Sequence, residues 1–331
     1  MNQAQAIEQM NRYGAAKTPF LFIIDFEGAE AYIKKLNEVD PQEIQYDIRG
    51  KQNAPTTHSK LGINKAITFT KKPMPYGQYQ QAFDQVLENI NFGNSYLLNL
   101  SALTPIETNL SLQEIFAHSK ATYKLWFRDQ WVVFSPEIFI QIEEGNISSY
   151  PMKGTIDAAI PNAEAIILAD PKETAEHNTI VDLIRNDLSA VAKNVRVERF
   201  RYIDTLQTLD KTLLQVSSKI VGDLPADYAH KIGELIFKLL PAGSISGAPK
   251  KKTIEIIKAT ENYERGFYTG IVGIFDGQNL DSGVMIRFIE RIGDQLYFKS
   301  GGGITTFSQA EAEYQELIDK VYVPIVRNHQ I

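Results

Sequence analysis

The sequence predicts an α+β fold with large, mostly antiparallel sheets. Segments with strand character come in runs rather than in regular alternation with helices, which favours antiparallel sheets over a doubly wound parallel sheet. Hydrophobic residues make up 44% of the 331 residues, enough for a substantial core. No Gly-Ser or Pro-rich linker divides the chain, so we expect one integrated domain.

The individual elements follow from hydrophobic spacing and from turn residues. Apolar residues at helical spacing predict helices at residues 1–13, 29–39, 79–90, 170–189, 228–240, 251–262 and 309–327. Apolar, β-branched and aromatic runs predict strands at residues 20–25, 44–50, 95–103, 123–127, 131–134, 138–143, 147–150, 195–205, 212–221, 270–275, 283–291 and 295–300. The polar segment 51–75 contains Pro55, Gly62 and Pro73 and is predicted to be a loop.

Composition narrows the classes of function. The chain has no cysteine, which excludes disulfides, cysteine-ligated zinc and thiol catalysis. Its net charge of −6 argues against a nucleic-acid partner, and the basic cluster Lys250–Lys252 is too short to form a binding patch. No apolar run is long enough to span a bilayer, and the start has no secretory signal. We therefore expect a cytoplasmic protein without a membrane partner.

Two predicted helices each carry a pair of carboxylates three residues apart. Glu173 and Glu176 project from one face of the helix at 170–189, in which Pro171 suits the first turn. Glu313 and Glu316 form a second pair near the end of the chain. The two pairs could converge on one hard divalent cation such as Mg²⁺, which prefers oxygen ligands. The alternative is two solvated acidic helix faces.

Three other charged residues are candidates for chemistry. Lys153, followed by Gly154 in the segment PMKGT, is either a solvated lysine or a nucleophile whose pKa is tuned by its neighbours. Arg287 interrupts an apolar strand and needs a carboxylate partner, from the protein or from a substrate, and Tyr268 could bind the same anion. Glu137 begins a strand and is either an exposed turn residue or a buried acid or base.

Two segments rich in small residues could approach a ligand closely. In the segment 243–257, Ser244 precedes a predicted helix and could donate to an anion, although an ordinary capped turn explains it equally well. The segment 299–305 holds three consecutive glycines, which indicate a tight bend or a close ligand. It has neither the Walker nor the dinucleotide-binding spacing. The histidines are scattered, and His177 borders the first acidic pair.

Taken in order, these segments resemble the chorismate-utilising enzymes, and among them the short form of aminodeoxychorismate synthase component I. The resemblance covers residues 79–323 through the motifs SPE, P-x-K-G-T, D-x-K-E-x-x-E-H with V-D-L-x-R-N-D, G-S-x-S-G-A-P-K, R-G-x-Y-T-G and E-x-x-E. It implies a chorismate-binding fold with a sandwich-like core and helices outside. It also implies one catalytic domain over residues 1–331, of which residues 1–78 are a shortened N-terminal part.

The resemblance assigns a role to each candidate residue. The carboxylates around Mg²⁺, which would hold the ring carboxylate of chorismate, are Glu173, Glu176, Glu313 and Glu316. The contacts to the enolpyruvyl carboxylate are Tyr268, Arg287 and the backbone amides of Gly301, Gly302 and Gly303. The residues that line the ligand are Gly154, Thr155 and Ser244, with Lys320 near the metal-binding helix. Glu137 is implicated in loss of the C4 hydroxyl.

Lys153 decides the subclass, because anthranilate synthases typically carry alanine at this position and aminodeoxychorismate synthases typically carry lysine. The implied mechanism is attack of the neutral Lys153 amine on C2 of chorismate, loss of the C4 hydroxyl assisted by Glu137, and addition of ammonia at C4. The product is 4-amino-4-deoxychorismate, a precursor of p-aminobenzoate and folate. Nearby Mg²⁺ or partial burial would lower the pKa of the amine.

The sequence departs from the family pattern at two positions. Leu97 stands where many members have glutamine and where water-adding members have a lysine base, which argues against a water-adding enzyme. Gln215 stands where other members often carry histidine. The tryptophan-binding motif of longer members is not found, so we expect no feedback inhibition by tryptophan.

Without a cysteine the chain cannot supply the usual glutaminase nucleophile. Ammonia is expected from a separate glutamine amidotransferase subunit or from free ammonium, and aromatisation to p-aminobenzoate from another enzyme. Two alternatives stay open. One is anthranilate synthase component I, which aminates C2, and the other is a non-catalytic chorismate-binding subunit.

Overall fold

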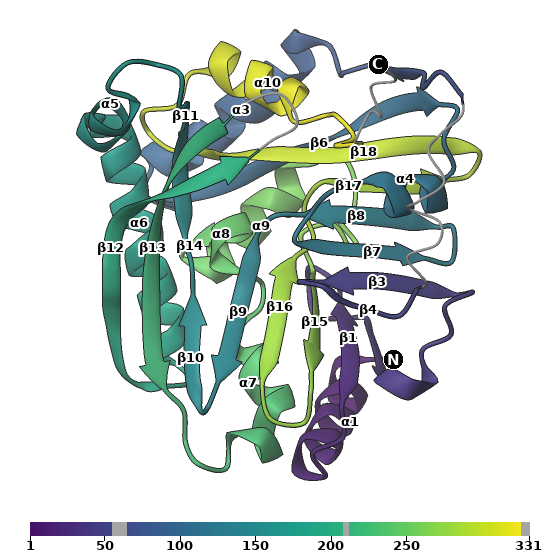
Figure 1. The fold of residues 1–331 in the computed structure, drawn as a ribbon. Coiled ribbons are helices and arrows are strands. Elements are labelled where there is room, and N and C mark those ends of the chain that lie inside the picture. The colour runs from purple at the N-terminus through teal and green to yellow at the C-terminus, as the bar shows by residue number, and fades with distance from the viewer. Residues whose placement is uncertain (55–64, 208–211, 326–331) are drawn as a thin grey trace.

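The computed structural model describes residues 1–54, 65–207 and 212–325. Over these residues the strands form two nine-stranded sheets in which neighbouring strands run antiparallel. Helices pack against both sheets, and α8 and α9 lie near the middle of the molecule (Figure 1). The predicted α+β class with large antiparallel sheets is therefore confirmed.

The first sheet joins the middle of the chain to its N-terminus. Its strands follow the order β11 (Met152–Asp157), β13 (Thr212–Asp223), β10 (Asn146–Ser149), β9 (Ile138–Glu143), β16 (Leu280–Val284), β15 (Ile271–Phe275), β1 (Phe20–Ile24) and β2 (Ala31–Lys35), and β12 (Lys193–Gln207) pairs with β13. The N-terminal β1 thus lies between β2 and β15, which follows it by about 250 residues.

The second sheet is built in the same way from distant parts of the chain. Its strands follow the order β14 (Gly247–Ala248), β6 (Leu97–Thr108), β18 (Gln295–Ile304), β17 (Phe288–Ile292), β8 (Trp131–Ser135), β7 (Tyr123–Phe127), β3 (Ile44–Ile48) and β4 (Lys51–Gln52), and β5 (Phe69–Lys71) pairs with β6. The long pair β6 and β18 runs across the top of the molecule in Figure 1.

The helices connect the strands of these sheets and pack against them. They are α1 (Gln3–Ala15), α3 (Tyr76–Asn91), α4 (Leu112–His118), α5 (Ala163–Ala169), α6 (Pro171–Ser189), α7 (Ile232–Leu239), α8 (Gly243–Ser246), α9 (Lys250–Thr260) and α10 (Ala310–Asp319), with short 3₁₀ turns at Leu36–Glu38 and Tyr228–Lys231. None of the helices in the described ranges is long and apolar enough to cross a membrane.

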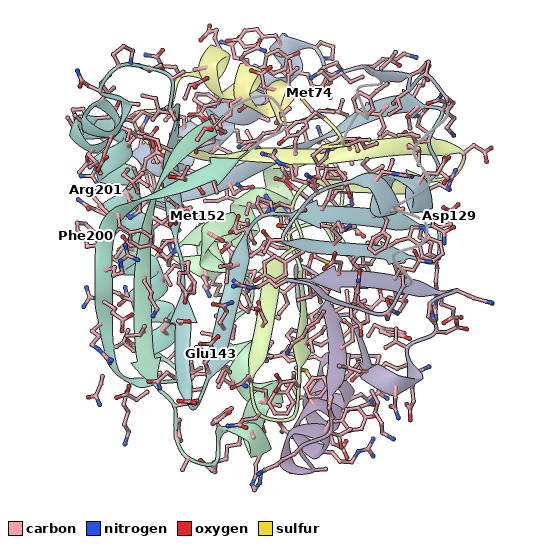
Figure 2. All side chains as sticks on the ribbon, in the orientation of Figure 1. Met74, Asp129, Glu143, Met152, Phe200 and Arg201 are labelled. Atoms are coloured by element: carbon pink, nitrogen blue, oxygen red, sulfur yellow. The ribbon has the colours of Figure 1, made fainter. Side chains whose placement is uncertain are left out.

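Helix α6 forms where the sequence predicts it. Asp170 caps its N-terminus by accepting a hydrogen bond from the backbone N–H of Glu173, and Pro171 occupies the first turn. Ile180, Leu183 and other apolar residues of α6 enter the largest core cluster, which contains side chains from both sheets. Side chains fill the space between sheets and helices (Figure 2), so α6 rests on a packed core.

Two predicted elements are wrong. Residues 29–39 form β2 and a 3₁₀ turn instead of a helix, because Ala31 and Ile33 alternate with more exposed residues and pair with β1. The predicted strand 283–291 is two strands in different sheets, β16 and β17. The extended conformation is interrupted between them at Arg287, whose φ of +55° is incompatible with a strand.

Other predicted boundaries also change. The last helix ends at Asp319 and not at residue 327. The predicted loop 51–75 contains the short strands β4 and β5, and its residues 55–64 lie outside the described residues. Helices α4 and α5 and strand β11 were not predicted as elements.

Candidate active site

A cavity of about 320 Å³ lies where the two sheets, α6, α8 and the end of α10 meet. The predicted site residues that line it are Glu137, Lys153, Gly154, Thr155, Ser244, Tyr268, Arg287, Gly301, Gly302, Gly303, Glu316 and Lys320. Gln215, one of the departures from the family pattern, also lines it and donates a 3.4 Å hydrogen bond to Thr155 Oγ1. The structure thus brings together residues that are up to 183 positions apart, from Glu137 to Lys320.

Lys153 reaches into this cavity from β11. Its ammonium group donates a 3.2 Å hydrogen bond to Glu176 Oε2 on α6, and its side chain is 24% exposed. The next residue, Gly154, has φ of +79°, and a Cβ there would lie 3.0 Å from Glu173 Oε2. The left-handed backbone conformation favours glycine at position 154, and a Cβ there would also force the end of the Glu173 side chain to move.

Glu137 also lines the cavity, immediately before β9. Its side chain is partly buried, and Ser244 on α8 donates a 2.5 Å hydrogen bond to its Oε1. Burial raises the pKa of the Glu137 carboxyl group, while the Ser244 hydrogen bond and the charge of Lys153 partly oppose this effect. A carboxyl group with a raised pKa is suited to donate a proton near neutral pH.

The three consecutive glycines form part of a strand. The sequence predicts a tight bend or a close ligand approach here, and the family resemblance predicts a glycine turn. Gly301 and Gly303 belong to β18 and pair with Ser101 and Asn99 of β6. A Cβ on Gly303 would lie 3.2 Å from Lys153 Nζ. The missing side chains leave the strand open toward the cavity, so that the lysine can reach it.

Leu97 borders the same place. Its Cδ1 atom would lie 3.2 Å from a Cβ on Gly303, the same distance as Lys153 Nζ. The Leu97 side chain is buried and apolar. The wall of the site beside the lysine amine therefore contains no acid or base at this position.

Arg287 and Tyr268, the two predicted anion-binding residues, both line the cavity. Among the described residues no carboxylate forms an ion pair with Arg287, whose contacts are a 3.4 Å hydrogen bond to the Lys320 carbonyl and the ring of Tyr322 at 5.4 Å. Its guanidinium is thus available to a ligand carboxylate. Tyr268 is buried, and burial raises the pKa of its hydroxyl, which stays protonated as a hydrogen-bond donor.

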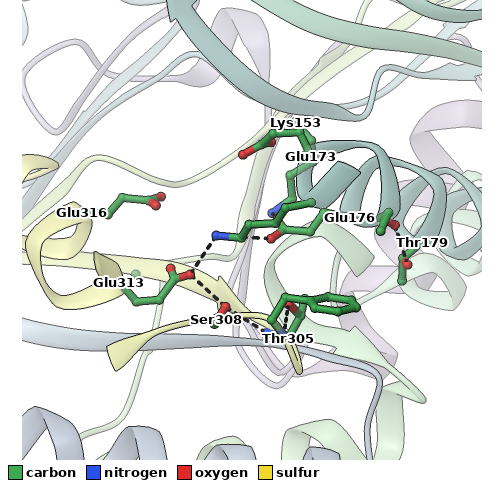
Figure 3. Close-up of polar contacts among 12 residues, drawn as sticks. Lys153, Glu173, Glu176, Thr179, Thr305, Ser308, Glu313 and Glu316 are labelled. Carbon is green, nitrogen blue, oxygen red and sulfur yellow. Dashed lines mark hydrogen bonds and ion pairs between the residues drawn. The ribbon is translucent and has the colours of Figure 1, made fainter. Parts of the chain in front are cut away.

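The four predicted metal-binding carboxylates come together from two helices, and we call them the carboxylate cluster. They are Glu173 and Glu176 on α6 and Glu313 and Glu316 on α10 (Figure 3). The side chains of Glu176 and Glu313 are 8% and 6% exposed. Lys172 stands between them, with its Nζ 3.8 Å from Glu176 Oε1 and 3.6 Å from Glu313 Oε1.

Charges within the cluster act on one another. Burial and the neighbouring Glu176 raise the pKa of Glu173, and burial and Glu316 raise that of Glu313. Burial alone would also raise the pKa of Glu316, but Lys320, at 2.6 Å, lowers it. The carboxylate cluster is therefore an electronegative site that a positive charge would stabilise.

This donor set fits Mg²⁺ in chemistry, because all of its atoms are carboxylate oxygens. The ammonium of Lys172 already stands as a cation between two of the carboxylates. Within the described ranges, however, no three acidic or histidine side chains are grouped closely enough to hold a metal ion. The magnesium site therefore stays a prediction.

Sequence reasoning missed a buried ion pair that supports the cavity walls. Arg265 donates to Glu261 through Nε (2.8 Å) and Nη2 (2.6 Å), and both side chains are almost fully buried. The same guanidinium donates to the carbonyls of Ile245 and Asn99. It thereby ties α8, which carries Ser244, to strand β6. Helix α9 ends at Thr260, so helical spacing gave no signal for this pair.

His177, which borders the acidic pair in sequence, contacts a different element. Its Nε2 lies 2.7 Å from Ser218 Oγ on β13, and its side chain is fully buried. Burial lowers the pKa of His177 to about 4, so the ring is neutral at physiological pH. It packs α6 against the sheet.

Comparisons with known proteins agree with this geometry. A family model described as chorismate binding enzyme matches residues 3–325. The chain is 52% identical to an uncharacterised PabA-like protein of Haemophilus influenzae over 96% of both chains. It is 32% identical to aminodeoxychorismate synthase component 1 of Klebsiella aerogenes, over 77% of this chain and 60% of that protein.

Solved structures share the fold. MenF, the menaquinone-specific isochorismate synthase of Escherichia coli, superposes with a TM-score of 0.71 at 15% identity, over 96% of this chain and 80% of that chain. Anthranilate synthase component I of Streptococcus pneumoniae superposes with a TM-score of 0.66 at 24% identity, over 77% and 59%.

Proposed function

The chain belongs to the chorismate binding enzymes, and on that premise we propose that it aminates chorismate at C4 to give 4-amino-4-deoxychorismate. The observation that carries the proposal is the position of Lys153. Its amine lines the cavity, contacts Glu176 at 3.2 Å and reaches the open face of β18 at Gly303. A lysine so placed suits a nucleophile that acts on a bound ring.

In the first step, the partly exposed ammonium group of Lys153 loses a proton to solvent, and the resulting neutral amine attacks C2 of chorismate. The N–C2 bond forms, the ring double bonds shift, and the C4–O bond breaks. Glu137 gives its proton to the departing hydroxyl, which leaves as water, and the raised pKa of Glu137 supports this role. Ser244 orients the acid through its hydrogen bond.

In the second step, ammonia attacks C4, the double bonds shift back, and the N–C2 bond breaks. Lys153 leaves as the free amine, and the C4 ammonium group formed by the attack returns a proton to Glu137. Both residues are then ready for another cycle. We propose that a separate glutamine amidotransferase subunit supplies the ammonia, since the cysteine-free chain has no usual glutaminase nucleophile. A relative that is named component 1 of aminodeoxychorismate synthase supports a second component.

The remaining residues bind and orient the substrate. Arg287, Tyr268 and the backbone N–H groups of Gly301–Gly303 are suited to the enolpyruvyl carboxylate. Glu173, Glu176, Glu313 and Glu316 would hold Mg²⁺, with Lys320 beside them. When bound, Mg²⁺ would neutralise and position the ring carboxylate of the dianionic substrate.

Two alternatives predict different products. Anthranilate synthase would aminate C2, where no covalent role for Lys153 is needed. A water-adding isochorismate synthase would need a base near the ring, and the apolar Leu97 beside Lys153 disfavours it. We therefore favour C4 amination.

The test is to incubate the protein with chorismate, ammonium and Mg²⁺ and to identify products by chromatography and mass spectrometry. We expect 4-amino-4-deoxychorismate from the wild type, loss of most activity in Lys153→Ala, and wild-type activity in Lys251→Ala, an exposed lysine on α9. Anthranilate or isochorismate as the product would refute C4 amination, and only the membership in the chorismate binding enzymes would stand. Unchanged chorismate, also with a glutaminase present, would support a binding subunit.

A further inference from the structure

Lys172 lies at the point where the carboxylate cluster comes together. Its ammonium is within 3.8 Å of Glu176 on α6 and 3.6 Å of Glu313 on α10, so it links the two helices. It contacts Oε1 of Glu176, whereas Lys153 contacts Oε2 of the same carboxylate. The two lysines thus each contact one oxygen atom of the same buried carboxylate.

The burial of these groups is uneven. The side chains of Glu176 and Glu313 are 8% and 6% exposed, and buried carboxylates need a compensating positive charge. The side chain of Lys172 is 43% exposed. Its ammonium therefore has a route to solvent, and the flexible four-carbon chain allows it to leave without backbone movement.

We propose that Lys172 is a built-in competitor for the divalent cation at the carboxylate cluster. The ammonium contacts Oε1 of Glu176 and of Glu313, so a divalent cation held by these two carboxylates would displace Lys172 to solvent. The inference rests on the proposed function, which assigns Mg²⁺ to this cluster.

Electrostatic repulsion favours this exchange. An ammonium and a divalent cation held by the same two carboxylates would repel each other, and the repulsion is strong where burial limits screening by water. Before the metal binds, Lys172 offsets the negative charge of Glu176 and Glu313. The metal must break these two ion pairs to bind, so Lys172 lowers the affinity of the cluster for the metal.

The first experiment measures Mg²⁺ binding by isothermal titration calorimetry, without substrate, for wild type, Lys172→Met, Lys172→Arg and Lys251→Met. We expect Lys172→Met to lower the dissociation constant roughly fivefold to twentyfold, a range that discounts the pair for its partial exposure. Lys172→Arg keeps the competing charge and should not tighten binding. Lys251→Met removes the same charge from an exposed site on α9 and should match the wild type. A damaged fold does not produce tighter binding.

The second experiment uses the wild type alone and follows the displacement directly. An amine-reactive reagent labels the protein with and without Mg²⁺, and peptide mass spectrometry gives the modified fraction of each lysine. We expect Mg²⁺ to increase labelling of Lys172 and to leave Lys251 unchanged.

The outcomes separate this inference from the proposed function. If wild type and Lys172→Met bind Mg²⁺ equally, or the variant binds more weakly, Lys172 is not a competitor while the magnesium site stands. Unchanged or reduced labelling of Lys172 on addition of Mg²⁺ leads to the same conclusion. If neither protein binds Mg²⁺, the magnesium site of the proposed function is wrong, and the inference is wrong with it.

Discussion

Replacing Ser244 with alanine is predicted to move the pH dependence of the reaction. The Ser244 hydroxyl donates a 2.5 Å hydrogen bond to Glu137 Oε1, which stabilises the charged carboxylate and opposes the effect of burial on its pKa. A hydrogen bond to a charged group contributes about 1.5–3 kcal/mol, and a factor of ten in protonation corresponds to about 1.4 kcal/mol. Loss of this bond is therefore expected to move the titration of Glu137 to higher pH, with the energy of the hydrogen bond, about 1.5–3 kcal/mol, as the upper limit of the effect.

The sign follows from the role of Glu137 as an acid. Activity requires the protonated carboxyl group, so it falls as pH rises through the pKa of Glu137. A higher pKa in Ser244→Ala keeps the group protonated to higher pH, and the alkaline limb of kcat/KM moves in the same direction. The assay measures kcat/KM for chorismate with ammonium across a pH series. The ratio of variant to wild type at each pH cancels the changing fraction of free ammonia.

A matched control lies on the same helix. Ser246 donates its hydroxyl hydrogen bond to the carbonyl of Ala242, so Ser246→Ala removes a buried hydroxyl without removing the bond to Glu137. A ratio for Ser244→Ala that does not vary with pH, or an alkaline limb that moves to lower pH, would refute the idea that Ser244 stabilises the carboxylate of Glu137.

Two further predictions concern the free energy of unfolding, measured by urea denaturation. Arg265→Met leaves Glu261 buried without its partner, so we expect the free energy of unfolding to fall by about 3–5 kcal/mol. Adding Glu261→Leu should recover part of this loss. A loss below about 1 kcal/mol in Arg265→Met would contradict this reasoning. Gly247→Ala places a Cβ against the carbonyl oxygen of Leu97 at φ of +126° and should cost more than about 2 kcal/mol. Gly50→Ala, with φ of +87° and no atom within 4 Å, should cost only about 1 kcal/mol, and equal losses for the two glycines would exclude the collision as the cause.

Local chemistry made part of the structure predictable. The start of α6 could be read from Asp170 and Pro171, because capping depends on neighbouring residues alone. The spacing of Glu173 and Glu176 likewise predicted that both would share one helix face. The antiparallel α+β class followed from runs of strand-like segments.

Other features depend on contacts between distant segments and could not be read locally. The residues between β16 and β17, around Arg287, include no glycine or proline that would predict the end of a strand. The interruption is explained by the pairing of β16 and β17 with different sheets. The glycines of β18 belong to a strand because β6 lies beside them. The contact of Lys172 with Glu313 depends on how α6 and α10 pack, which no spacing within either helix reports.

The sharing of strands between both ends of the chain has a consequence for synthesis on the ribosome. Strand β1 needs β15 as a neighbour, and β6 pairs with β18 over a register that extends from Leu296 to Ile304. An emerging chain therefore holds unpaired strand edges until nearly all residues have been made, and such edges are prone to association with other chains. Because these late pairings also close the cavity around Gly301–Gly303, the ability to bind a ligand should arise only after translation is almost complete.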